Sequence, residues 1–62
     1  MLEKYTAKVF DLRDRQVKQK TFYAPSFMDA EHESHKLANE VEKKGIIVGG
    51  TTVMFWGHKY DK

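Results

Sequence analysis

Two histidines near the middle of the chain are the first residues whose types and spacing suggest chemistry. His32 and His35 lie three positions apart, with Glu33 between them. The zinc-protease pattern His-Glu-x-x-His uses a spacing of four, which stacks both imidazoles on one face of a helix. Both histidines also fall on the polar side of a predicted helix. We therefore expect solvated histidines, and neither a metal nor any other cofactor.

A Gly-Gly-Thr-Thr sequence at positions 49–52 is the second candidate, because glycine-rich turns cradle phosphates. Such a loop needs a helix after it, whose N-terminus faces the phosphate. Strand-like sequence follows here instead, which indicates a turn or a connection. No Ser-His-Asp arrangement stands out, and most carboxylates lie on the polar side of the predicted helix. We expect a protein without catalytic residues, and not an enzyme.

Lysines interleaved with aromatic residues are the third candidate. Single-stranded nucleic acid is bound by rings that stack on bases beside a positive groove. Aromatic residues are equally the anchors of protein–protein interfaces. The residues in question are Lys8, Phe10, Lys18, Lys20, Phe22 and Trp56.

Length and composition limit what can position these groups. The 62 residues, 40% of them hydrophobic and 32% charged, predict a single small domain over residues 1–62. Cysteine is absent, which excludes disulfides and thiolate metal sites. The net charge of +2 combines a basic segment, 1–25, with an acidic one, 26–44. The N-terminus predicts no secretory leader and the apolar block 46–56 is too short to span a membrane, so we expect a cytoplasmic protein without membrane contact.

Alternating polarity predicts an antiparallel hairpin at the start of the chain. The alternation runs over Lys4–Leu12 and again over Val17–Tyr23. Between them, Arg13–Gln16 is polar and predicts a loop of three to five residues.

A helix follows the hairpin. Pro25 ends the second strand, Ser26 is a suitable N-cap with Asp29 three residues later, and Gly45 fits the left-handed position after the last turn. The apolar stripe at helical spacing consists of Phe27, Ala30, Ser34, Leu37, Ala38 and Val41.

The last third of the sequence allows two interpretations. In the preferred one, residues 46–51 are a connection and Thr52–Lys59 form a third strand. In the alternative, Gly49-Gly50 is a hairpin turn between two short strands, which gives a ββαββ fold of the β-grasp kind. Strands of three residues would be marginal, which favours the first interpretation.

The preferred order, ββαβ, predicts an α+β fold with a three-stranded antiparallel sheet in the order 2-1-3 and the helix on one side. The helix is expected to cover Tyr5, Ala7, Val9, Val17, Thr21, Tyr23, Val53 and Phe55. The opposite side, left open, would present aromatic and basic residues, and an exposed apolar patch usually marks a contact site. The alternative is that a bulge or a wrapped terminus returns some of these aromatic residues to the core, because one extra residue reverses the alternation. The predicted partner-binding residues on it are Phe10, Lys18, Lys20, Phe22, Met54, Trp56, His58 and Tyr60.

In size and order of elements the chain resembles small bacteriophage host-takeover proteins, such as the phage inhibitor of host RNA polymerase. The likeness covers the hairpin 5–23, the Ala24-Pro25-Ser26 connection, the acidic helix 29–44 and the terminal strand 53–60. It implies an inhibitor that acts in the host cytoplasm on a host protein, such as RNA polymerase or another nucleic-acid enzyme. In that family basic side chains of the third strand contribute to binding, and His58 and Lys59 are the basic residues here.

The sequence thus predicts a small protein-binding module, with an inhibitor as its specific form. Two alternatives use the same side of the sheet. One is binding of single-stranded nucleic acid, and the other is a homodimer in which two open sides pack together.

Overall fold

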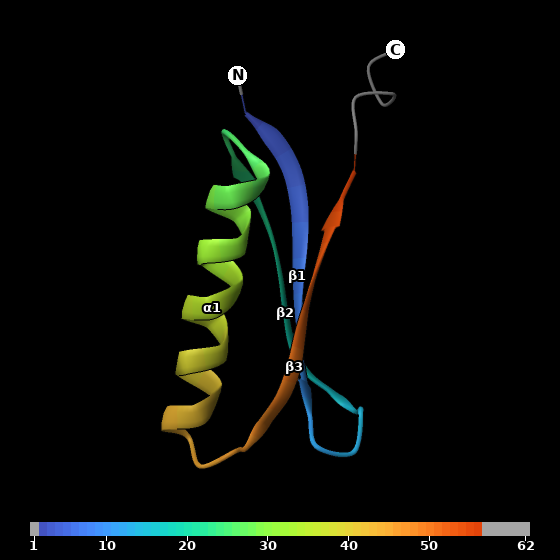
Figure 1. Ribbon diagram of the computed structural model, residues 1–62, viewed down its shortest axis with the longest axis vertical. Coiled ribbons are helices and arrows are strands. Elements are labelled where there is room, and N and C mark those ends of the chain that lie inside the picture. Colours follow the sequence, from blue (N-terminus) through green and yellow to red (C-terminus); the bar gives the residue numbers. More distant parts are fainter. Residues whose placement is uncertain (1, 57–62) are drawn as a thin grey trace.

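Three antiparallel strands and one helix make up the fold, in a computed structural model that describes residues 2–56. The elements are β1 (Glu3–Asp11), β2 (Gln16–Ala24), α1 (Phe27–Lys43) and β3 (Val48–Phe55). The strand order is β2-β1-β3, and α1 runs along one side of the sheet (Figure 1). The predicted ββαβ fold is confirmed, and the alternative with a Gly-Gly hairpin is wrong.

The loop between β1 and β2 is organised by one carboxylate. Oδ1 of Asp11 accepts the backbone N–H groups of Arg13 and Arg15 at 2.8 and 3.0 Å, and Oδ2 accepts Nε–H of Arg15 at 3.1 Å. These bonds, led by the Arg15 N–H, hold the pKa of Asp11 below its usual value of 3.8 against the opposing effect of desolvation. Asp14 completes the turn at φ 62°, a left-handed conformation that Asp tolerates better than most residues.

The helix begins and ends where the sequence predicts. Ser26 Oγ accepts the N–H of Asp29 at 3.3 Å and donates to its carboxylate at 3.0 Å. At the other end Gly45 adopts φ 93°, and its N–H bonds to the carbonyl of Glu42 at 2.9 Å. Four members of the predicted stripe are buried, namely Ala30, Ser34, Leu37 and Val41.

Tyr5 is the centre of the core at one end of the sheet. It is 1% exposed, and its ring lies 6.2, 6.1 and 5.3 Å from the rings of Phe22, Phe27 and Phe55. Its hydroxyl donates to Glu3 Oε1 at 2.9 Å, so the one polar atom of this side chain is satisfied. Burial, followed by the bond to Glu3, raises the pKa of the phenol above 10.0.

A bulge in β2 reverses the predicted sides of most of that strand. Val9 pairs with Lys18 but Phe10 pairs with Gln16, so Val17 is an extra residue. Val17 and Phe22 are five positions apart, so a regular strand would place them on opposite sides. Because of the bulge, both pack on the core. The prediction that Thr21 and Tyr23 face the helix is wrong, since they lie opposite Thr6 and Lys4 on the other side.

β3 begins earlier than predicted because the two glycines belong to it. Phe10 pairs with Gly50 and Asp11 with Val48, which leaves Gly49 as a second bulged residue. A Cβ at Gly49 would lie 2.5 Å from the carbonyl oxygen of Asp11, whereas one at Gly50 would meet nothing within 4 Å. Gly49 is thus required for the close approach of two backbones. The predicted end of this strand at Lys59 lies outside the described residues.

No helix within residues 2–56 is both long enough and apolar enough to cross a membrane.

The two glycines provide a matched test of the bulge. Gly49→Ala should lower the free energy of unfolding by about 1–3 kcal/mol, because the new methyl group meets backbone that cannot move aside. Gly50→Ala should change it by no more than about 0.5 kcal/mol, since the space is open. Urea unfolding followed by circular dichroism measures both. Equal losses in the two variants would show that Gly49 has no special role.

Asp11 should contribute to the acid sensitivity of the fold. Its pKa is lower in the folded chain, so the carboxylate stabilises the fold above pH 3.8, and that contribution is lost as the pH falls through the folded pKa. The stability difference between wild type and Asp11→Asn should therefore shrink as the pH is lowered below about 4. Asp14→Asn is the control, because Asn accepts the same positive φ. Stability curves that stay parallel for wild type and Asp11→Asn would contradict this role.

Candidate functional site

The side of the sheet that faces away from α1 is the candidate site, and we call it the open face. Even-numbered residues of β1 lie on it, flanked in register by residues of β2 and β3. From one end of the sheet to the other, the rows are Tyr23–Lys4–Trp56, Thr21–Thr6–Met54, Gln19–Lys8–Thr52 and Gln16–Phe10–Gly50.

Trp56 is fixed on the open face by hydrogen bonds at its backbone and its ring. Its N–H donates to the Lys4 carbonyl at 3.0 Å, which extends the ladder one residue beyond β3. Its indole Nε1–H donates to Thr6 Oγ1 at 2.9 Å, and the Thr6 hydroxyl also bonds to that of Thr21 at 2.9 Å. Thr6 is only 3% exposed although it lies on the side away from α1, whereas Trp56 itself remains 44% exposed. The ring is therefore both anchored and accessible.

A cation contacts the same ring. Lys4 Nζ lies 4.9 Å from the centre of the Trp56 ring, within the range of a cation–π interaction. Lys4 therefore stands over the ring and limits the area on which another flat group can stack.

Three of the predicted partner-binding residues share the open face. Trp56 and Met54 lie near one end, 44% and 41% exposed, and Phe10 lies half-buried near the other. Phe10 lines a shallow depression together with Asp14, Gly50, Thr51 and Thr52. His58 and Tyr60 lie outside the described residues.

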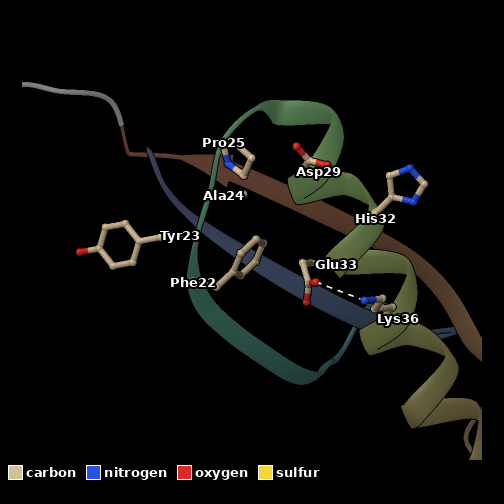
Figure 2. Close-up of a pocket in the computed structure, with 8 residues that line it drawn as sticks. All are labelled: Phe22, Tyr23, Ala24, Pro25, Asp29, His32, Glu33 and Lys36. Carbon is tan, nitrogen blue, oxygen red and sulfur yellow. Dashed lines mark ion pairs between the residues drawn. The ribbon is translucent and has the colours of Figure 1, made fainter. Parts of the chain in front are cut away.

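The open-face placement of the three predicted residues in β2 is wrong. Lys18 and Lys20 pair with Val9 and Ala7 on the helix side, and Phe22 pairs with Tyr5 there. In Figure 2, Phe22 and Tyr23 point to opposite sides of β2. The cause is again the bulge at Val17, which no pattern of polarity reveals.

Tyr23 is the main functional candidate that sequence reasoning missed. It is 60% exposed and lies at the end of the row that holds Lys4 and Trp56. One signal was available, because two adjacent aromatic residues in a strand must face opposite sides. The pattern of alternation alone could not say which of Phe22 and Tyr23 is buried.

A second hollow lies on the other side of β2, between that strand and the start of α1 (Figure 2). Its wall includes Phe22, Asp29, His32 and Glu33. Glu33 is already engaged by Lys36 at 3.5 Å and Lys20 at 3.8 Å. Both His32 and His35 are exposed, and among residues 2–56 no group of three or more acidic or histidine side chains is placed to hold a metal ion. The carboxylate of Glu33 in this hollow is thus already paired with two lysines.

No protein-family model, curated protein or solved structure was found to match the chain.

The anchoring of Trp56 can be tested directly, because it is the only tryptophan in the sequence. Thr6→Val keeps the shape of the side chain and removes the acceptor of the indole N–H. It should lower the free energy of unfolding by about 0.5–1.5 kcal/mol. It should also lower the fluorescence anisotropy of Trp56 and shift its emission to the red.

Thr21→Val is the matched control. It removes the hydrogen bond between the two threonines but leaves the acceptor of the indole in place. Its stability loss should be smaller, because one hydrogen bond is lost instead of two, and the emission and anisotropy of Trp56 should be unchanged. The same fluorescence change in both variants would mean that the bond to Thr6 does not fix the ring.

Proposed function

We propose that this protein is a non-catalytic interaction module that binds another protein through the open face. The observation that carries the proposal is the anchored, half-exposed ring of Trp56, with the exposed Tyr23 in the same row and the exposed Met54 in the next. Rings of this kind contribute large contact areas in interfaces. Because Trp56 is already held in one orientation, binding loses less side-chain entropy than it would with a mobile ring.

The charges around the rings indicate the chemistry of the partner. Lys4 and Lys8 occupy the central row positions of the open face. A complementary surface has an apolar centre with acidic groups beside it. The likeness in topology to phage host-takeover proteins makes a bacterial host protein, RNA polymerase first, the partner to test, with inhibition as the proposed consequence of binding.

Single-stranded nucleic acid fits the open face less well than a protein does. Lys18 and Lys20 lie on the helix side, and Lys20 is 3.8 Å from Glu33. Lys4, one of the two lysines among residues 2–56 on the open face, stands over the Trp56 ring on which a base would stack. Quenching of Trp56 fluorescence by an oligothymidine at low salt, lost at high salt, would favour nucleic acid over the proposal.

The test is affinity capture from a bacterial lysate, followed by titration of the purified partner. Tyr23→Ala should weaken binding at least about tenfold, as expected for an interface anchor. Met28→Ala is the matched control, because Met28 is 70% exposed on α1, away from the open face. Equal affinity of the Tyr23→Ala variant and wild type would contradict the proposed site.

A second pair of variants separates the two sides by charge. Lys8→Glu places a negative charge on the open face and should weaken binding, whereas Lys18→Glu makes the same change on the helix side and should not. Circular dichroism verifies that each variant is folded. A larger effect of Lys18→Glu than of Lys8→Glu would assign the partner to the opposite side of the sheet.

A further inference from the structure

The two edges of the sheet differ in their chemistry. Within residues 2–56, β2 and β3 are the outer strands, and each pairs with β1 alone. β2 carries Lys18 and Lys20, the kind of residue that blocks pairing between strand edges. β3 has the sequence Val-Gly-Gly-Thr-Thr-Val-Met-Phe, which contains no charge and no proline. The β2 edge is thus protected by charge, whereas the β3 edge, from Val48 to Phe55, carries no charge.

The backbone of β3 presents hydrogen-bonding groups outward. The N–H of Trp56 bonds to Lys4, the residue directly opposite, so even-numbered residues of this ladder direct their backbone groups toward β1. In an antiparallel ladder the intervening residues direct theirs away. Thr51 and Val53 therefore offer their N–H and C=O groups at the outer edge of β3.

We propose that this edge pairs with β3 of a second copy of the same chain, antiparallel and in the register Thr51 to Val53 of the partner. Such a pair has a two-fold axis at Thr52, so both copies form the same bonds. The two open faces then join on one side of a six-stranded sheet, with both copies of α1 on the other side.

The side chains of β3 are self-complementary in this register. The two Thr52 side chains meet at the axis, a cross-strand pair that can form a hydrogen bond. Met54, 41% exposed, lies opposite Gly50 of the other copy. Within one chain no atom lies within 4 Å of the position that a Cβ on Gly50 would take, so the Met54 side chain has room there. Thr51 lies opposite Val53 on the helix side. No pair brings charges together.

The same pairing at the opposite edge is disfavoured. A two-fold axis at Gln19 of β2 would place Lys18 of each copy directly opposite Lys20 of the other, and like charges in that position repel. Assembly through β3 alone closes after two copies, because the new outer edges are both β2. The expected product is a dimer rather than a fibre.

Sedimentation velocity over a range of concentrations tests the proposal. Wild type should associate reversibly to a dimer. Thr52→Glu should weaken association at least tenfold, because two carboxylates would meet at the axis. Within one chain the same carboxylate lies opposite Lys8, an attractive pair, so the fold is expected to tolerate it.

Gln19→Glu is the matched control, because Gln19 flanks Lys8 on its other side, in β2. It should leave association unchanged under edge pairing. Equal weakening by both variants would instead indicate that the open faces pack together, and would overturn the proposal. A mixture of the Thr52→Glu and Thr52→Lys proteins should associate again, since opposite charges then meet at the axis.

Hydrogen exchange on the wild-type protein gives a readout that needs no variant. The amides of Thr51 and Val53 should become at least tenfold more protected as the concentration rises through the association range. A wild type that stays monomeric at the highest attainable concentration would overturn the proposal, and so would a dimer in which these two amides gain no protection.

Discussion

One helix on a three-stranded sheet is the constraint on which the other features depend. The 17 residues of α1 cover one side of β1, where Tyr5, Ala7 and Val9 are almost completely buried. The other side of the central strand is also shielded from water at Thr6, which is 3% exposed. A polar residue suits that position because its hydroxyl bonds to Trp56 and Thr21. The Trp56 ring thereby helps to cover the side of the sheet that faces away from α1, and the same ring, 44% exposed, remains accessible to a partner.

Much of this arrangement could be predicted because local chemistry agrees with the fold. Ser26, Asp29 and Gly45 mark the helix ends by the groups they offer to unpaired backbone, and the structure uses them in that way. The sides of β1 and of residues 53–56 followed from simple alternation. The strand order followed from the handedness of the crossover. These inferences depend on patterns among residues close together in the chain, which can be recognised in the sequence itself.

The errors have a common physical cause, which is the bulge. An extra residue at Val17 reverses the side of every later residue in β2 without altering its polarity pattern. At Gly49 the extra residue lies within β3, and its glycine was interpreted as part of a connection rather than as the point where two backbones approach. Both bulges are defined by how β2 and β3 pair with β1, a property of the assembled sheet. The predicted site was wrong in β2 for this reason. Tyr23, and not Phe22, lies on the open face, and Lys18 and Lys20 lie on the helix side.

β3 is the strand that contributes least to the core, and this is why both proposed contacts involve it. Of its eight residues only Val48 and Val53 are even half-buried, whereas all but two residues of the central stretch 5–10 of β1 are buried. Apart from Gly49, a residue of β3 outside the core is free to be selected for what it presents to another molecule, because its replacement costs little stability. The strand nevertheless has a fixed position, since β1 holds it in register from Tyr5 to Asp11. A recognition element needs a fixed position and side chains that are not required for the core, and β3 has both. The edge of β3 and the Trp56 ring that follows it can therefore act as two adjacent but separate binding surfaces.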